Sequence, residues 1–421
     1  MNILWLNVVE VGVARTFSLL AGTVVLFLTA RILGPERQGI IAAAVAWVSL
    51  FANFAGLSLG QVTHYRIQKI KSQDWFPTVF GGLLFFVFVL SAIAYLVAFG
   101  VYHLTNGEMF KSIPPVVITI TFALLPLIIW DQFSSNLLAA VGKLRIYNTA
   151  QYVGRAVWVL MTITFIVIMN FGVMGAIMAQ IMGLSIMTII GFIALWKLVP
   201  GGIQLRKAEI KEMLKGSGKL HFNTVSALLL SQSSILMLNH FATKAEVGWF
   251  QLAYQMVIML LIIPQAASIV FFARMSEVGP DSLWQEQKKL IIQILGVIVL
   301  LSIITYLVAP AVVLLVVGVD FMPAVKIFRL LLPVAIGMSL AQLMTSQWIG
   351  RGAFLSTTIA TSCVAAANIA ANAVLIPKFG MLGAVWASLV SYLGITVLVQ
   401  VYYAWLCEKK SRKVLRGNFI S

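Results

Sequence analysis

The chain alternates between long runs of apolar residues and short polar breaks, and this pattern continues from one end to the other. A helix needs about 20 mostly apolar residues to cross the hydrocarbon core of a bilayer. Twelve runs reach that length, and each predicts a membrane-spanning helix. They cover residues 8–33, 39–63, 77–103, 114–141, 149–170, 173–196, 219–241, 249–272, 290–315, 324–349, 356–376 and 382–406. The first run carries Glu10 and Arg15, and the seventh opens with polar residues around His221 and Asn223, so these two are the weakest spans.

Composition agrees with a membrane protein. Hydrophobic residues make up 61% of the 421 residues and charged residues only 10%, whereas soluble domains carry about 25% charge. Two cysteines, Cys363 and Cys407, exclude a disulfide scaffold and a four-cysteine metal site. The four histidines show no metal-ligand spacing. The sequence therefore predicts neither a metal nor a cofactor. The N-terminus lacks a basic start and is not expected to be a cleaved signal.

Basic residues are distributed unevenly between the two sets of loops. The loops after the even-numbered runs, together with the C-terminal tail, hold 20 Lys and Arg residues, and the opposite loops hold four. Because cytoplasmic loops are enriched in Lys and Arg, both termini are predicted to lie in the cytoplasm. This asymmetry accounts for the net charge of +16, so a nucleic-acid partner is not expected.

The two halves of the sequence resemble each other at a nearly constant spacing. The segment Phe171–Ala176 recurs 208 residues later as Phe379–Ala384, with the same Phe-Gly start and Gly-Ala end. A duplicated sequence of this kind predicts repeated structure. Three further pairs keep a spacing of 208 or 209 residues: Gly142 with Gly350, Pro115 with Pro323, and Gly39 with Gly248.

The duplication predicts an all-α protein of two six-helix bundles. An even number of spans gives both halves the same orientation, as parallel repeats related by an axis along the membrane normal. Such halves enclose a central cavity and expose it to alternate sides by rocking. The expected organisation is a bundle at 1–200, a cytoplasmic linker at 201–218, a second bundle at 219–406 and a basic tail at 407–421. The linker has helical apolar spacing, which indicates an interfacial helix or a partner-binding element.

Three charged residues fall deep within the predicted spans: Arg15, Asp131 and Arg155. Each costs about 2.5–3.5 kcal/mol at the bilayer centre if it faces lipid, so each should face the interior, pair or line water. Asp131 and Arg155 are expected at about 16 and 10 Å from the same cytoplasmic turn, close enough in depth to interact. They are either a neutralising pair that holds two helices together or part of a binding or ion-coupling site.

The remaining cations lie nearer the outer ends of spans. Lys326 and Arg329 share a helix face, and either reach the interface or form a basic patch in the cavity. For Arg31, a structural role is slightly favoured over a role in substrate binding. Arg15 lacks a well-placed acid, so an anionic ligand is favoured there. This basic balance suits a phosphate, which a guanidinium binds with a forked donor. The candidate substrate-binding residues are Arg15, Arg31, Arg155, Lys326 and Arg329, and Asp131 is the candidate for ion coupling.

Two junctions resemble a known family. The segment Ala30–Gly39 resembles the junction between the first two helices of bacterial polysaccharide transporters, the O-antigen flippases. The segment Ile376–Ala384 resembles the junction between their last two helices. The twelve spans, the cytoplasmic termini and the six-plus-six repeat also match this family, so the resemblance covers the whole chain.

The resemblance implies a fold and a function. The fold is that of the multidrug/oligosaccharidyl-lipid/polysaccharide (MOP) exporter superfamily, with a MATE-like arrangement of two bundles around a cavity. The implied substrate is an undecaprenyl-pyrophosphate-linked oligosaccharide, moved from the cytoplasmic to the periplasmic leaflet of the bacterial inner membrane. A proton or sodium gradient is the implied driving force. Polysaccharide polymerase and chain-length proteins are the implied partners, in addition to membrane lipid.

Three alternatives remain open. A cation-coupled multidrug exporter of the same superfamily is the first, although acids and aromatic residues would suit its cavity better than arginines. A lipid II flippase is the second, although such proteins usually have two further helices. A membrane polymerase or ligase is the third, but the longest outer loop, at 104–113, has only about ten residues and is too short to build a catalytic site. The protein is therefore not expected to be an enzyme.

Overall fold

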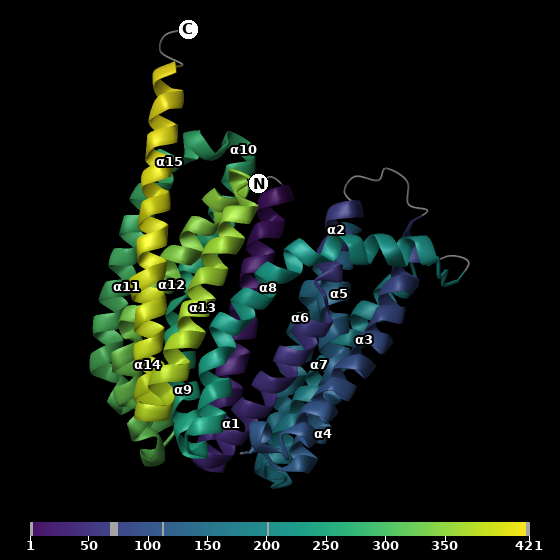
Figure 1. The fold of residues 1–421 in the computed structure, drawn as a ribbon, viewed down its shortest axis with the longest axis vertical. Coiled ribbons are helices and arrows are strands. Elements are labelled where there is room, and N and C mark those ends of the chain that lie inside the picture. The colour runs from purple at the N-terminus through teal and green to yellow at the C-terminus, as the bar shows by residue number, and fades with distance from the viewer. Residues whose placement is uncertain (1–2, 68–74, 112, 200–201, 418–421) are drawn as a thin grey trace. The chain divides into compact units, whose positions relative to one another are not determined.

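The computed structural model describes residues 3–67, 75–111, 113–199 and 202–417, and nearly all of them are helical (Figure 1). Within these ranges no strand is present, as the sequence predicted for an all-α protein. The helices before the middle of the chain are α1 (Ile3–Ala55), α2 (Leu59–Ile67), α3 (Phe76–Leu104), α4 (Pro115–Phe122), α5 (Leu124–Ala140), α6 (Leu144–Thr162) and α7 (Gly172–Trp196). Those after it are α8 (Lys207–Phe241), α9 (Lys244–Leu260), α10 (Ile262–Val278), α11 (Pro280–Val316), α12 (Met322–Gly350), α13 (Phe354–Phe379), α14 (Met381–Ser388) and α15 (Val397–Gly417).

Short segments of other helical types complete the chain. A π-helix, Ile163–Ile168, extends α6, and a second one, Leu389–Thr396, joins α14 to α15. Two single-turn 3-10 helices, Glu108–Phe110 and Val319–Phe321, lie in connections between spans. These segments continue the helical course and leave the number of membrane crossings unchanged.

Nine helices in the described residues are long and apolar enough to cross a membrane, or ten if the bent pair α9 and α10 is one span. The first predicted span and most of the second lie within α1, which is broken at Gly34 with φ of 77° and ψ of 173° and has Pro35 directly after the break. The seventh predicted span, which its polar start made weak, lies in α8 and is not among the nine. The multi-span architecture predicted from hydropathy is thus confirmed.

Helix α8 joins the predicted linker to the predicted seventh span. We expected a separate short helix within 201–218, but the helix starts at Lys207 and continues without a break to Phe241. Met213 is fully buried on its first part, and a Cβ at Gly82 of α3 would lie 3.3 Å from its sulfur. Lys211 and Lys215 are exposed on the same part. The first part of α8 is therefore anchored on α3 by its apolar side.

The helices form two compact units. One unit contains residues 17–248, and the other contains residues 249–421 together with residues 1–16. The predicted bundle boundaries at 200 and 219 remain predictions about the duplication, because compactness and sequence repetition are different properties. Each unit is described separately below.

Aromatic packing forms the core of the unit at 17–248. Phe80 of α3 is fully buried and contacts Trp130 of α5, with ring centroids 5.8 Å apart, and Phe192 of α7, at 5.9 Å. Phe192 in turn stacks on Trp196 at 5.6 Å. Buried aromatic rings contribute large contact areas in preferred edge and offset geometries. This cluster holds α3, α5 and α7 in place, and the polar groups described below are mounted on these helices and their neighbours.

Helices α6 and α7 approach each other closely through two glycines. A Cβ on Gly154 would lie 2.7 Å from the carbonyl oxygen of Gly183, and a Cβ on Gly183 would lie 2.8 Å from the carbonyl oxygen of Gly154. Small residues permit such approach between membrane helices, where van der Waals packing replaces the hydrophobic effect. This contact fixes the position of α6, which carries Arg155.

The repeated Phe-Gly segment has the same structure in both places. Gly172 and Gly380 both have a positive φ, of 59° and 53°, at the turn between two helices. Three residues later, Gly175 and Gly383 face the end of the preceding helix. A Cβ there would lie 3.1 Å from the Phe165 carbonyl oxygen in the first case and 2.7 Å from the backbone nitrogen of Ile376 in the second. The sequence repeat therefore corresponds to a repeated helix connection.

A second repeated pair makes a reciprocal contact within residues 17–248. A Cβ on Gly39 would clash with the carbonyl oxygen of Lys244, and a Cβ on Gly248 would clash with the carbonyl oxygen of Pro35. Lys244 follows Pro35 at the same spacing as Gly248 follows Gly39. The repeat therefore makes Gly248 equivalent to Gly39 and Lys244 equivalent to Pro35. Two equivalent segments that contact each other through equivalent residues in both directions are related by a two-fold axis. A local two-fold axis thus passes between these two segments.

Buried amides hold one end of the other unit together. Gln287 of α11 and Gln347 of α12 are fully buried, and the Gln347 side chain donates to Gln287 Oε1 at 2.7 Å. Arg351 donates to Gln347 Oε1 at 3.0 Å and forms an ion pair with Asp281 at 2.8 Å. The aromatic pair Trp348 and Tyr403 stacks alongside, on α12 and α15. Arg351, one of the basic loop residues counted in the sequence for orientation, therefore also stabilises the fold.

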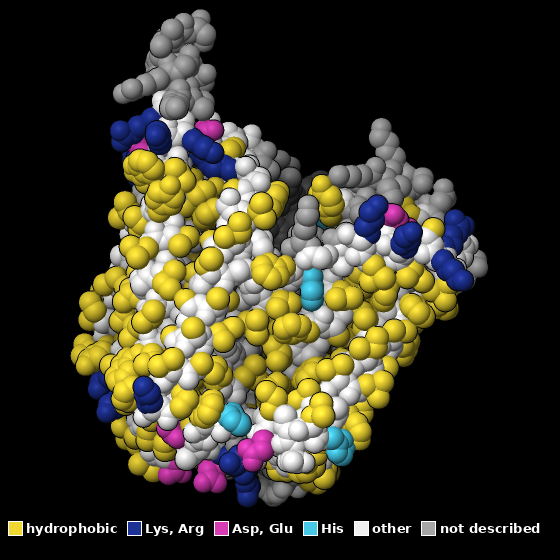
Figure 2. Space-filling model, in the orientation of Figure 1, with side chains coloured by type: hydrophobic (Ala, Val, Ile, Leu, Met, Phe, Trp, Pro, Cys, Tyr) yellow, Lys and Arg dark blue, Asp and Glu magenta, His cyan; other side chains and the backbone are white. Residues whose placement is uncertain are grey.

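Side-chain type varies along each unit taken by itself. Hydrophobic side chains cover the flanks of the helices, and Lys and Arg gather at helix ends, over the first part of α8 and at the end of α15 (Figure 2). Lys409 and Lys410 on α15 are exposed, and the Lys409 ammonium lies 5.4 Å from the ring centre of Trp405. An apolar flank with cations and tryptophan at its edge is typical of a membrane-embedded surface.

The close approach of α6 and α7 generates a test. We expect Gly183→Ala to lower the melting temperature of the purified protein, because overpacking costs about 1–3 kcal/mol. Gly100→Ala on α3 is the matched control, since nothing lies within 4 Å of its Cβ position and alanine favours the helix by about 0.5–1 kcal/mol. Thermal unfolding in detergent measures both. Equal melting temperatures for the two variants would show that the contact is not tight.

Candidate functional site

Asp131 and Arg155 lie near each other in the unit at 17–248. Asp131 is on α5 and Arg155 is on α6, and both are half-buried. They attract each other electrostatically, but no ion pair within 4.0 Å joins these two described residues. The Arg155 guanidinium instead lies 5.2 Å from the ring centre of Trp158, and its Nε is buried without a hydrogen-bond partner in the described part of the chain. The pair is thus close but leaves donors of Arg155 unused.

A polar row continues from Arg155 along the same face of α6. Gln151 lies one turn before Arg155 and donates to the hydroxyl of Tyr147 at 2.6 Å. The side-chain oxygen of Gln151, Oε1, accepts a hydrogen bond from the Ser18 hydroxyl of α1 at 3.2 Å. The spacing of four residues places Tyr147, Gln151 and Arg155 on one face. This row is a line of polar side chains along one face of α6.

The other two N-terminal cations, Arg15 and Arg31, are both carried by α1. Arg15 is exposed on α1 and makes no hydrogen bond or ion pair with another described residue. It belongs to the unit that contains residues 1–16, whereas Arg155 belongs to the other one. Arg31 is exposed on α1, three residues before the break at Gly34. The predicted role of Arg15 and Arg31 in substrate binding therefore remains a prediction.

Arg329 has a structural partner within its own unit. Its Nε donates to the carbonyl oxygen of Tyr306 at 3.0 Å, and its guanidinium lies 4.4 Å from the centre of the Tyr306 ring. Pro310 lies four residues after Tyr306 inside α11. A proline has no N–H, so the Tyr306 carbonyl loses its usual helical partner. Arg329 replaces that partner, while Lys326, on the same face of α12, is exposed.

A second polar site lies in the unit at 17–248, where α1, α2, α5 and α8 meet. It is a cavity of about 180 Å³. Seven of its nine lining residues have uncharged polar side chains, and the other two are Gly60 and Phe133. In a chain that is 61% hydrophobic, this concentration of amides and hydroxyls is unusual. The polar lining residues are Asn53, Ser58, Gln61, Gln132, Ser135, Asn136 and Thr224.

Hydrogen bonds hold this polar cavity in shape. Gln132 donates to the Asn53 Oδ1 at 3.2 Å, and Asn136 donates to the backbone oxygen of Gln132 at 2.8 Å. Ser58 donates to the Thr224 hydroxyl at 3.1 Å. The chain between α1 and α2 forms the rim, where Leu57 and Ser58 have positive φ values of 47° and 53°.

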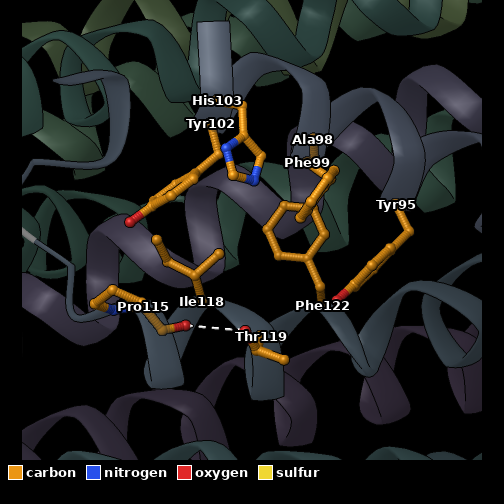
Figure 3. Close-up of a pocket in the computed structure, with 9 residues that line it drawn as sticks. All are labelled: Tyr95, Ala98, Phe99, Tyr102, His103, Pro115, Ile118, Thr119 and Phe122. Carbon is orange, nitrogen blue, oxygen red and sulfur yellow. Dashed lines mark hydrogen bonds between the residues drawn. The ribbon is translucent and has the colours of Figure 1, made fainter. Parts of the chain in front are cut away.

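An aromatic groove lies elsewhere in the same unit, between the end of α3 and the start of α4 (Figure 3). Its volume is about 160 Å³. Phe99 and His103 lie edge to face at 4.3 Å on one side, and Thr119 donates to the Pro115 carbonyl oxygen at 3.0 Å on the other. No Lys, Arg, Asp or Glu is among the described residues that line it. The groove is thus separate in chemistry from the Asp131–Arg155 region.

Sequence reasoning did not find the polar cavity or the row beside Arg155. A signal was present, since Tyr147, Gln151 and Arg155 follow each other at four-residue spacing, as do Gln132 and Asn136. Charged residues inside spans are rare and attract attention, whereas single amides and hydroxyls do not. What the spacing could not reveal is that four helices bring such residues to one place.

Comparison with solved structures places the fold among transporters of the MOP superfamily. An inward-facing multidrug resistance MATE family transporter of that superfamily matches with a TM-score of 0.72 and 16% identity, over 94% of this chain and 96% of that one. The lipid II flippase MurJ, in an inward closed conformation, matches with a TM-score of 0.74 and 12% identity, over 97% and 92%. A MOP superfamily transporter from Pyrococcus furiosus matches with a TM-score of 0.64 and 15% identity, over 96% of each chain.

The family follows from the sequence itself. Residues 4–279 match the model of a family described as polysaccharide biosynthesis protein. That range is well over half of the chain, so the protein belongs to this family. No match is found among curated proteins. The protein is therefore a multi-pass membrane protein of the polysaccharide biosynthesis family with a MOP transporter fold, as the two helix junctions had indicated.

The contact between Arg329 and Tyr306 generates a test. We expect Arg329→Ala to destabilise the protein by about 1.5–3 kcal/mol, because a hydrogen bond from a charged donor is lost. Pro310→Ala restores an N–H to α11, so Arg329→Ala in that background should cost clearly less. Melting temperatures of the four proteins in this double-mutant cycle measure the coupling. The same loss in both backgrounds would mean that Arg329 does not serve the Tyr306 carbonyl.

Proposed function

We propose that this protein is a flippase that moves an undecaprenyl-pyrophosphate-linked oligosaccharide from the cytoplasmic to the periplasmic leaflet of a bacterial inner membrane. The observation that carries the proposal is the family match over residues 4–279. The fold of MOP transporters supports it, because that fold suits movement of a substrate by alternating access. Both termini are proposed to be cytoplasmic, on the basis of the loop charges.

The proposed role of Arg155 is to bind the pyrophosphate. Its guanidinium is half-buried and makes no hydrogen bond to a described residue. Unused guanidinium donors in a low-dielectric site bind phosphate oxygens strongly, often through two parallel hydrogen bonds. Arg15 is proposed to act on the same group at another stage of transport, since it too has no partner among the described residues. Arg31, Lys326 and Arg329 are secondary candidates, and Arg329 already serves Tyr306.

Asp131 is the proposed site of ion coupling. It is a half-buried acid inside a span, next to a cation that it attracts but does not bind directly. A carboxylate in that position can exchange its interaction with Arg155 for a proton or a sodium ion. Substrate pyrophosphate would compete for Arg155 and so change the environment of Asp131. Through this competition the ion and the substrate affect each other's binding.

The function is tested in a strain that lacks the gene. We expect loss of surface polysaccharide, with lipid-linked oligosaccharide accumulating on the cytoplasmic side, and restoration of export by the wild-type protein. Arg155→Ala and Arg15→Ala should reduce export at least tenfold while the protein still inserts, and Arg155→Lys should restore part of it. Lys289→Ala, an exposed cation in the first third of α11, is the control and should export normally.

Three outcomes would each contradict a different part of the proposal. Unchanged surface polysaccharide in the deletion strain, together with new sensitivity to drugs, would assign the protein to the multidrug exporters. Normal export by both arginine variants would leave the flippase function in place and remove these arginines from substrate handling. Accumulation of lipid II instead of an oligosaccharide carrier would change the substrate.

Asp131 has its own test. We expect Asp131→Asn to lose the dependence of export on the ion gradient, because an amide neither takes up a proton nor neutralises a cation. Asp320→Asn, an exposed acid beside α12, should leave that dependence unchanged. Export in inverted vesicles, measured with imposed pH or sodium gradients, separates the two. Gradient-driven export by Asp131→Asn at every pH would exclude a coupling role.

A further inference from the structure

We infer that the polar cavity between α1, α2, α5 and α8 binds one sugar residue of the transported oligosaccharide. The inference rests on the proposed function and names a second contact with the same substrate. The cavity lies wholly within residues 17–248. Its described lining contains amide side chains on α1 and α5, at Asn53, Gln132 and Asn136, and three hydroxyls, of Ser58, Ser135 and Thr224.

The chemistry of the lining favours a neutral, hydroxyl-rich ligand. Amide side chains offer both donors and acceptors, and hydroxyls offer the same combination in one atom. A sugar hydroxyl also donates and accepts, so it matches such a surface at several points. No Lys, Arg, Asp or Glu is among the described residues that line the cavity. The described lining therefore lacks the cation that a pyrophosphate needs, which distinguishes this site from Arg155.

Part of the hydrogen-bonding capacity of the cavity is unused. Gln132 donates to Asn53, but no hydrogen bond to its Oε1 is made within the described residues. The Asn136 amide donates to the Gln132 backbone, and its Oδ1 is likewise free of a described partner. Gln61 is exposed on α2 and makes no hydrogen bond in the described part of the chain. These atoms are available to a ligand.

The backbone at the rim is strained. Leu57 and Ser58 are consecutive non-glycine residues with positive φ, and each such residue costs about 1–3 kcal/mol. The strained turn brings the Ser58 hydroxyl to 3.1 Å from that of Thr224 and to 3.5 Å from Nδ1 of His221, both on α8. A simple continuation of α1 into α2 would avoid the strain but would not form this rim. Strain of this kind concentrates at binding sites.

Gly56 and Gly60 have no side chains, which leaves the cavity unfilled and lets the helices around it approach closely. A Cβ at Gly56 would lie 2.9 Å from the Gln132 Oε1, so any side chain there would displace the free oxygen. A Cβ at Gly60 would lie 2.8 Å from the Gln132 backbone oxygen and 3.1 Å from the Asn136 Nδ2. The volume of about 180 Å³ is below the roughly 300–1,000 Å³ of pockets for drug-sized ligands. The site therefore fits one sugar residue and not a whole oligosaccharide.

Sugar binding is tested directly on the purified full-length protein in nanodiscs. The probes are the methyl glycosides of glucose, galactose, N-acetylglucosamine and rhamnose at millimolar concentration, observed by saturation-transfer NMR. We expect transfer to at least one glycoside with the wild type, and about tenfold weaker binding with Gln132→Leu, a change worth about 1.4 kcal/mol. Gln293→Ala, an exposed amide on α11, is the control and should bind as the wild type does.

A second variant keeps the test decisive if Gln132→Leu does not fold. Gln61→Ala removes an exposed side chain that bonds to no described residue, so folding is preserved, and we expect at least threefold weaker sugar binding. No saturation transfer to any of the glycosides with the wild type would overturn the inference. Wild-type binding that persists unchanged in the folded cavity variants would also overturn it.

Export measured in parallel separates this inference from the proposed function. Sugar binding that depends on Gln132, in a protein whose loss leaves surface polysaccharide unchanged, would support the cavity and contradict the flippase. Normal export with no sugar binding would support the flippase and contradict the cavity. Loss of both sugar binding and export in Gln132→Leu, with a normal Gln293→Ala, is the expected result.

Discussion

The hydrocarbon core of a bilayer offers no hydrogen bonds, and this constraint governs most of the structure. Every polar group within a span needs a partner in the protein or a water-filled space. Pro310 shows the constraint acting on the backbone, because the carbonyl oxygen that it leaves without a helical partner accepts a hydrogen bond from Arg329 on the next helix. An arginine that looks like a functional cation in the sequence can thus be required by a proline nineteen residues earlier.

The same constraint divides the polar side chains into two groups. Gln287, Gln347 and Arg351 are joined to one another by hydrogen bonds, and Arg351 is paired with Asp281, so they stabilise one end of a unit. Arg155 and the amides of the polar cavity retain unused donors and acceptors. Groups of the second kind are costly without a ligand. Their location at Arg155 and around a polar cavity is the physical basis for assigning substrate contacts to these two sites.

The sequence predicted depth along the membrane better than position around each helix. Apolar run length located the spans, and the depths of Asp131 and Arg155 were close enough to predict their neighbourhood, which the structure shows. Depth alone could not reveal that Arg155 would lie over Trp158 instead of bonding directly to Asp131. It also could not assemble the polar cavity, because the lateral order of α1, α2, α5 and α8 depends on packing contacts such as those of Gly56 and Gly60. The sequence also did not predict that α8 is one continuous helix. The first part of α8 is held by a packing contact between its Met213 and α3, which the hydropathy of the segment does not reveal.

Gly39 and Gly248 face each other across a local two-fold axis. This geometry imposes the same steric constraint on both positions. Each glycine lies against the backbone of the other segment. Substitution of either one by alanine would therefore force the two segments apart. A larger residue at one position cannot be balanced by a smaller one at the other, because no residue is smaller than glycine. If the predicted sequence repeat arose by duplication of one gene, this contact would keep both copies of the position as glycine while the rest of the two halves diverged.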